Sequence, residues 1–208
     1  MLIAIHPQTP DKRKIKIVAD CLRAGGTIIF PTDTVYGLGC DIFNKEAIEK
    51  ICQQKKIDPE KHNLTMLCSS ISQLTDYALQ IDNRLFFTIK NIVPGPYTFI
   101  LKAGKEIPKL FKNKKKTIGV RIPDNLIVQA LIAELGNPLF SSSIHEDDEI
   151  VDYFVDPELI EEQKGHLVDY VIDGGSGGKI PSTIIDCTTL PVQIIREGLG
   201  KLEVFDIR

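Results

Sequence analysis

Apolar residues recur at helical spacing in several stretches of the chain, each bounded by residues that begin or end helices. After Thr9-Pro10-Asp11, apolar residues from Ile15 to Leu22 share one helical face, and Gly25-Gly26 follows. Asn44 is a favourable cap for a second helix, which runs through Gln54. The same criteria predict three further helices, over 72–78, over 82–91, and from Asn125 to Gly136.

Short runs of β-branched and apolar residues predict strands between these helices. Thr27–Phe30 is too short and too uniformly apolar for a surface helix, so it indicates a central strand. Strands and helices alternate at first, whereas the end of the chain is rich in strands, which favours an α/β fold with a mixed sheet. With 208 residues and no obvious linker, we expect one domain over residues 1–208. The remaining predicted strands are 2–5, 64–68, 97–101, 117–122, 139–142, 168–172, 183–187 and 192–196.

The composition is that of a globular protein and predicts no membrane association. No apolar run approaches the roughly 18 to 20 residues of a membrane-spanning helix, and the N-terminus lacks the pattern of a signal peptide. We therefore expect a cytoplasmic protein. Its five cysteines form no CxxC pair and have no histidine at ligand spacing, so we expect them to be reduced, mostly buried, and not part of a metal site.

The net charge of −3 hides two segments of opposite sign. Between Lys102 and Arg121 there are eight basic residues and one acid, and between Glu146 and Glu162 there are nine acids and no lysine or arginine. Such segments are usually solvated surface. The alternative is that the lysine block at 112–116 rims a site for phosphates or RNA.

Pro31–Gly39, which reads PTDTVYGLG, directly follows the predicted central strand. We expect a strand-to-helix turn that lines a pocket for a small ligand. Thr32, Thr34 and Tyr36 alternate, so in an extended chain their hydroxyls point to one side and can bind one ligand. These residues are equally typical of a turn whose hydroxyls bind its own backbone. The sequence leaves both interpretations open.

Cationic residues occur at two places where an anionic partner is needed. Lys55-Lys56 and Lys61-His62 follow the predicted helix that ends at Gln54, where they either interact with the helix C-terminus or rim a site. Arg121 lies inside an otherwise apolar strand. Its partner is either an internal acid or a carboxylate or phosphate of a ligand.

Hydroxyls and glycines mark two further segments. Alternation along Ser141–Ser143 places Ser141 and Ser143 on one face of a strand, where they can donate hydrogen bonds to a ligand. A Ser/His/Asp triad with His145 lacks the GxSxG context of a nucleophile elbow. GGSGGK (174–179) lacks both the preceding glycine and the following Ser or Thr of a Walker phosphate loop.

Six motifs occur in a fixed order along nearly the whole chain. They are PTDTVYGLG (31–39), PGPYTFIL (94–101), TIGVRIP (117–123), PLFSSS (138–143), PSTIID (181–186) and IIREG (194–198). Together they resemble the YrdC/YciO family, and QQKKIDPEKHNLTMLC (53–68) is more similar to its YciO branch than to YrdC itself. The resemblance implies a YrdC-like α/β fold, in which a twisted mixed β-sheet with flanking helices surrounds a large, positively lined cavity.

Characterised YrdC proteins are threonylcarbamoyl-AMP synthases, a kind of nucleotidyltransferase. The resemblance therefore implies a nucleotide-binding protein that combines ATP, L-threonine and bicarbonate, with Mg²⁺, and releases pyrophosphate. The product serves the t6A modification of tRNA. The alternative is a non-catalytic protein of the YciO branch that binds tRNA or double-stranded RNA through the basic cavity and the lysine block.

The resemblance also suggests roles for individual residues. It places Thr32, Thr34 and Tyr36 near the threonine. The family's motifs contain Lys-x-Arg and Ser-x-Asn, where this chain has Ile57 in place of the arginine and His145 in place of the asparagine. The residues expected to be catalytic are Lys55, Arg121 and Ser143, and those expected to bind nucleotide or carboxylate are Thr117, Ser141, His145 and Arg196.

Overall fold

The computed structural model describes residues 1–58, 64–79, 81–108, 116–144 and 155–205, and in them ten strands form one mixed sheet. The strand order is β1-β8-β2-β3-β7-β4-β6-β5-β9-β10. The sheet contains both parallel pairs, such as β4–β6 and β5–β9, and antiparallel pairs, such as β3–β7 and β5–β6. The strands are β1 (Leu2–Ala4), β2 (Ile28–Phe30), β3 (Gly37–Asp41), β4 (Thr65–Leu67), β5 (Tyr97–Lys102), β6 (Thr117–Arg121), β7 (Leu139–Ser143), β8 (Tyr170–Asp173), β9 (Thr183–Asp186) and β10 (Gln193–Arg196).

The five helices predicted from the sequence are present, and polar side chains cap their N-termini. Asp11 accepts a hydrogen bond from the Lys14 amide at the start of α1, and Asn44 accepts one from Ala47 at the start of α2. Gly136 ends α5 in the left-handed conformation at φ 81°. The helices are α1 (Lys12–Arg23), α2 (Lys45–Gln54), α3 (Ile71–Tyr77), α4 (Asn83–Ile92), α5 (Leu126–Leu135) and α6 (Pro157–Lys164), with short 3-10 helices η3 (Gly165–Leu167) and η4 (Leu202–Phe205).

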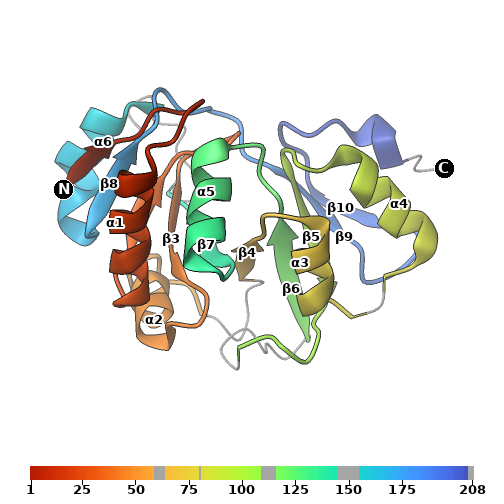
Figure 1. Cartoon of the computed structure of the whole chain (residues 1–208). Helices are drawn as coiled ribbons and strands as arrows, with labels where there is room; N and C mark the ends of the chain where they lie inside the picture. Colours follow the sequence, from red (N-terminus) through yellow and green to blue (C-terminus); the bar gives the residue numbers. More distant parts are fainter. Residues whose placement is uncertain (59–63, 80, 109–115, 145–154, 206–208) are drawn as a thin grey trace.

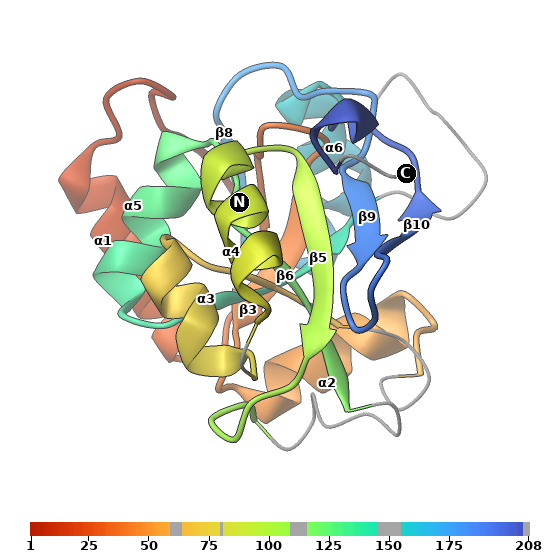
Figure 2. The ribbon, with the colours of Figure 1, turned by 90° about the vertical axis from the view of Figure 1, so that its right-hand side faces the viewer.

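Helices α1, α5, α3 and α4 lie together on one side of the sheet (Figure 2), and α1 packs against α5. Helix α2 packs against β3, and α6 packs against β8 and β1. The first and last strands of the chain, β1 and β10, lie at opposite edges of the sheet (Figure 1). None of the described helices is long and apolar enough to cross a membrane.

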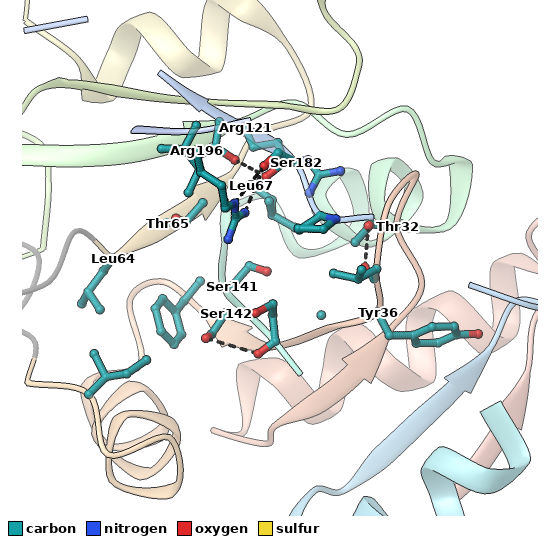
Figure 3. A pocket seen from close by; sticks show the side chains of 18 residues that line it. Thr32, Tyr36, Leu64, Thr65, Leu67, Arg121, Ser141, Ser142, Ser182 and Arg196 are labelled. Atoms are coloured by element: carbon teal, nitrogen blue, oxygen red, sulfur yellow. Dashed lines mark hydrogen bonds between the residues drawn. The ribbon is translucent and has the colours of Figure 1, made fainter. Parts of the chain in front are cut away.

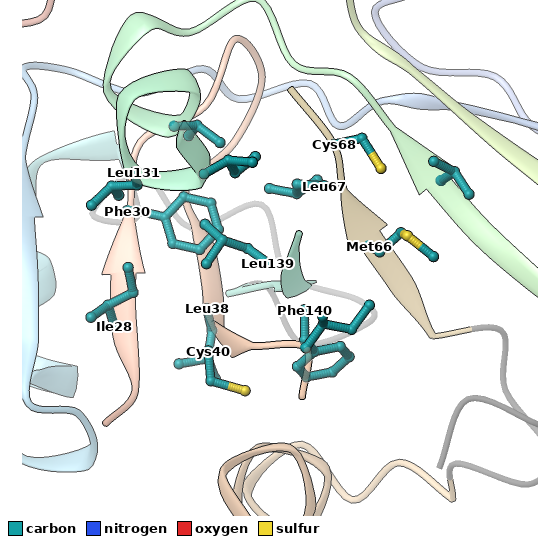
Figure 4. Close-up of a cluster of buried hydrophobic side chains, with 14 of the residues drawn as sticks. Ile28, Phe30, Leu38, Cys40, Met66, Leu67, Cys68, Leu131, Leu139 and Phe140 are labelled. Carbon is teal, nitrogen blue, oxygen red and sulfur yellow. The ribbon is translucent and has the colours of Figure 1, made fainter. Parts of the chain in front are cut away.

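Buried side chains of the central strands pack against α5 and α2 (Figure 4). Phe30 and Leu139 are fully buried next to Leu131 of α5. The cysteines are free, and all are buried except Cys21, which is partly exposed. Burial raises the pKa of the Cys52 thiol to about 11 and that of Cys187 to about 12. The expectation that the cysteines are mostly buried is confirmed.

The predicted strand-to-helix turn at Pro31–Gly39 is wrong, because its last three residues continue into a strand. Strand β3 pairs antiparallel with β2, with Phe30 opposite Gly37. Glycine allows β3 to pass close to β7: a Cβ added to Gly39 would lie 2.2 Å from the Phe140 carbonyl oxygen. The segment is therefore a strand–turn–strand unit, and the helix begins only after Asn44.

The acidic segment contains α6, which the apolar pattern did not predict. Asp156 accepts hydrogen bonds from the amides of Glu158 and Leu159, and Pro157 occupies the first turn. Both signals are typical of a helix start. The sequence therefore contains local signals for this helix. It was missed because the apolar periodicity of its eight residues is weak.

Candidate functional site

A cavity of about 320 Å³ is lined by the turn that follows β2 and by strands from β3 to β10 in the order of the sheet (Figure 3). This volume is at the lower end of the range of small-molecule sites. Its wall combines residues that are far apart in the sequence. Polar lining residues include Thr32, Tyr36, Arg121, Ser141, Ser182 and Arg196.

Arg121, at the end of β6, is the buried cation of this cavity. Its Nη2 donates to Asp33 Oδ1 at 2.6 Å, and the two side chains are 8% and 12% exposed. Burial lowers the pKa of the Arg121 guanidinium, and the adjacent Asp33 carboxylate opposes that shift. The sequence left open whether Arg121 pairs with an internal acid or with a ligand. The structure shows the internal acid.

This pair does not use all of its hydrogen-bonding atoms. Nε of Arg121 and Oδ2 of Asp33 are buried without a hydrogen-bond partner. Unpaired buried polar atoms are rare in folded proteins and call for an explanation. Arg121 also lines the cavity, where a guanidinium is suited to bind an anionic group such as a carboxylate or a phosphate.

The hydroxyls of the turn bind mainly to the protein itself. Thr32 Oγ1 donates to the Val35 carbonyl at 2.7 Å and lies 3.1 Å from Thr34 Oγ1. Thr34 is fully buried, and its Oγ1 accepts a hydrogen bond from Arg121 Nη2 at 2.9 Å. Thr32 therefore faces the cavity, whereas Thr34 lies outside the cavity lining and supports the arginine.

Tyr36 does not direct its hydroxyl to the same side as the two threonines. The hydroxyl donates to the Gly175 carbonyl at 2.7 Å, and Figure 3 shows the ring turned away from Thr32. Burial raises the pKa of Tyr36 to about 12. The prediction of three co-directed hydroxyls is wrong, because residues 31–36 form a turn rather than an extended strand.

Arg196 provides a second cation at the cavity. Its Nε and Nη2 both donate to the Ser182 carbonyl, at 3.3 and 3.0 Å. The Ser182 hydroxyl is buried 2.9 Å from Thr98 Oγ1, and both residues line the cavity. Our sequence interpretation did not assign Thr98 or Ser182 to the site, although both lie inside the quoted motifs PGPYTFIL and PSTIID.

The serines at the end of β7 also line the cavity. Ser141 lies opposite Gly39 of β3 and Thr65 of β4, and Ser143 lies opposite Gly37. The small side chains in this row leave room above the strands. Ser142 lines the cavity as well, and His145 lies outside the described residues.

Two predicted site residues lie elsewhere. Lys55 is the C-terminal cap residue of α2, and its side chain does not line the cavity. Thr117 is buried at the start of β6, four residues before Arg121, which corresponds to about 13 Å along a strand. Lys61, His62 and most of the lysine block lie outside the described residues.

The wall near α2 is apolar. Ile57, Leu64 and Phe140 line the cavity there. Ile57 also packs against the hydrophobic core. This wall can contact the apolar part of a ligand, while the two arginines bind its anionic groups.

No protein-held metal site is apparent in the residues that the structure describes. These residues contain no group of three or more His, Cys, Asp or Glu side chains placed to hold an ion. The described lining of the cavity includes no carboxylate. Mg²⁺ is generally held through carboxylates and substrate phosphates, so this donor set does not fit a protein-bound Mg²⁺.

The chain matches a family model and has relatives of nearly the same length. The model Sua5_yciO_yrdC, described as "Telomere recombination", matches residues 20–198. The chain is 42% identical to YciO of Escherichia coli K12 over 203 residues, which cover 97% of each chain. It is 30% identical to the threonylcarbamoyl-AMP synthase of Coxiella burnetii RSA 493 over 165 residues, which cover 79% of this chain and 87% of the synthase.

Solved structures share the fold. The crystal structure of E. coli YciO superimposes with a TM-score of 0.90 at 40% identity, covering 99% of this chain and 98% of YciO. P. abyssi Sua5 complexed with L-threonine gives a TM-score of 0.85 at 27% identity, covering 98% of this chain and 59% of Sua5. The mixed sheet and its flanking helices are common to these proteins.

Proposed function

Because this chain belongs to the Sua5/YciO/YrdC family, which includes threonylcarbamoyl-AMP synthases, we propose that its cavity binds L-threonine and ATP and forms threonylcarbamoyl-AMP. The observation that carries the proposal is Arg121, a buried cation that lines the cavity and is oriented by Asp33 and Thr34. A relative with the same fold, Sua5, has been crystallised with L-threonine.

The proposed reaction needs two bonds to form. The amine of threonine forms a C–N bond with the carbon of bicarbonate, and water is lost, which gives a carbamate. An oxygen of the carbamate then attacks the α-phosphorus of ATP. The bond from that phosphorus to the bridging oxygen breaks, and pyrophosphate leaves with the electron pair. The protein's contribution to such chemistry is mainly positioning and stabilisation of negative charge.

The described residues can supply both contributions. Arg121 is held by Asp33 and Thr34, so its guanidinium is oriented before a ligand arrives. Arg196 is held by the Ser182 carbonyl. Cations fixed in this way lose little conformational entropy when they bind a carboxylate or phosphate. Mg²⁺ would enter with the phosphates of ATP as part of the substrate, and we derive no step through it.

Threonine-dependent release of pyrophosphate tests the proposal. The full chain is incubated with ATP, L-threonine and bicarbonate, and the reaction is compared with one that lacks threonine. Arg121→Lys keeps the charge but loses the planar fork, so we expect release to fall by about tenfold or more. Arg13→Ala, which removes an exposed arginine of α1, is the matched control and should retain activity. Release that does not depend on threonine in the native chain would refute the synthase activity.

The RNA-binding alternative stays a prediction. Of the lysine block, residues 112–115 lie outside the described residues. The cavity has the volume and the mixed polar and apolar lining of a small-molecule site, which supports the synthase proposal over RNA binding.

A further inference from the structure

The connection between β8 and β9 crosses the molecule next to the cavity. Strand β8 is second in the sheet and β9 is ninth, so six strands lie between them in the described sheet. Residues 174–182 alone join Asp173 to Thr183. Figure 1 shows this blue connection passing from the half of the sheet with β8 to the half with β9.

The connection is barely long enough to span the distance between the two strands. Seven strand spacings in a flat sheet amount to about 34 Å. Ten Cα–Cα steps reach at most about 36 Å when fully extended. The connection can therefore join these strands only if it is extended or if the sheet curves toward it. In either case it links the two halves of the sheet that contribute the cavity walls.

The first part of this connection is docked on the turn that lines the cavity. The Gly178 amide donates to the Thr34 carbonyl at 2.7 Å, and the Gly175 carbonyl accepts from the Tyr36 hydroxyl at 2.7 Å. A Cβ added to Gly178 would lie 2.4 Å from the Thr34 carbonyl oxygen, which is backbone and cannot rotate away. A Cβ on Gly177 would lie 2.6 Å from the Tyr36 ring. Glycine is therefore required at both positions, because Thr34 and Tyr36 lie too close to leave room for a side chain.

Two points of the connection, its middle and its C-terminal end, support the two arginines of the cavity. In the middle of the connection, Gly178 binds the backbone of Thr34, whose hydroxyl accepts from Arg121. At the C-terminal end, the Ser182 carbonyl accepts from Arg196. Only four positions separate Gly178 from Ser182, so the distance between the two supports depends on how this short segment is held.

We propose that residues 174–182 form a strap that ties the cavity walls together and fixes the spacing of Arg121 and Arg196, with Gly178 as its positioning residue. This inference rests on the proposed function, because the ligand of that function carries a carboxylate and a phosphate and binds both arginines. Loosening the strap weakens ligand binding. The sheet stays folded, because no strap residue is part of the hydrophobic core cluster.

Two variants of the full chain test the strap by calorimetry. A Gly-Ser insertion between Ser176 and Gly177 lengthens it at an exposed position, and Gly178→Ala displaces it from Thr34. We expect each to raise the Kd for L-threonine and for inorganic pyrophosphate by about tenfold, with little change in the denaturation midpoint of the insertion variant. Ser72→Ala, an exposed change on α3 outside the strap, should bind like the native chain. Native affinity in a folded insertion variant would overturn the strap.

Hydrogen exchange on the native chain gives a second readout that does not depend on whether a variant folds. Ligand binding should slow exchange of the Gly177 and Gly178 amides by about tenfold, and unchanged exchange counts against the strap. The two probes separate this inference from the proposed function. If the native chain binds pyrophosphate but not threonine, the proposed function fails and pyrophosphate still tests the strap. If it binds neither, both are refuted.

Discussion

The Arg121 guanidinium donates to the Asp33 carboxylate at 2.6 Å, although the two residues are 88 positions apart in the sequence. Both side chains are almost fully buried, and Arg121 also donates to Thr34 Oγ1. The pair joins the end of β6 to the turn after β2, and the cavity lies beside it. The orientation of the cation is thus set by a carboxylate that is not itself part of the cavity lining.

Removal of the carboxylate should destabilise the fold. Asp33→Ala leaves a buried guanidinium without its charged partner, which we expect to lower the free energy of unfolding by about 3 kcal/mol. Chemical denaturation measures this change. The double variant Asp33→Ala with Arg121→Met should recover much of the loss, because it also removes the unpaired charge.

An exposed pair on α2 provides the control for this prediction. Lys45 and Glu49 lie 3.3 Å apart with side chains 72% and 42% exposed. Glu49→Ala should change the free energy of unfolding by less than about 0.5 kcal/mol. If Asp33→Ala has an effect as small as this, the buried pair does not contribute to stability as argued.

Lys56, directly after the C-terminal cap of α2, has a backbone conformation that favours glycine. Its φ is 53°, its amide donates to Gln53, and the next amide, of Ile57, donates to Cys52 at 2.8 Å. Lys56→Gly should therefore raise the free energy of unfolding by about 0.5 kcal/mol. Lys50→Gly, an exposed position within the same helix, should lower it by about 1 kcal/mol. Equal effects at both positions would contradict the role of the left-handed conformation.

Ile57 limits the positive charge of the cavity. Ile57→Arg places a third guanidinium at the lining, and we expect the affinity for ATP to rise by about tenfold at low salt, with a smaller gain at high salt. Calorimetry at two salt concentrations measures this change in ATP affinity. The matched control is Ile17→Arg, which adds the same charge to the exposed surface of α1. A similar gain in both variants would show that net charge, rather than the cavity, is responsible.

Stability should decline in alkali because buried acids stay protonated in the folded chain. Burial raises the pKa of Tyr36 from 10.0 to about 12 and that of Cys52 from 9.0 to about 11. Above the ordinary pKa values the unfolded chain binds fewer protons than the folded chain, so stability falls as pH rises.

The urea midpoint, followed by circular dichroism, measures this decline. For these groups we expect a constant midpoint below about pH 8 and a falling one from about pH 9 upward. Cys52→Ala should give a shallower slope between pH 9 and 11, because one of the shifted groups is gone. An unchanged slope would exclude Cys52 as a contributor.

The sequence predicted most elements because their signals are local. The caps Asp11 and Asn44 and the periodic apolar residues after them determine where α1 and α2 begin. Strand β3 was missed because GLGCD has no β-branched residue, and its pairing depends on the close approach of β7. Glycine marks such an approach without saying which strand makes it.

For the site, the sequence by itself determined that polar motifs follow strand ends and that Arg121 needs an anionic partner. It did not show that the partner is Asp33, that Thr98 bonds with Ser182, or that Lys55 and Thr117 lie outside the cavity lining. These features depend on the order of the strands in the sheet, where neighbours such as β3 and β7 are distant in the chain. Local propensities carry no information about that order, because burial of the shared core and pairing of the strands determine it only when the whole chain folds.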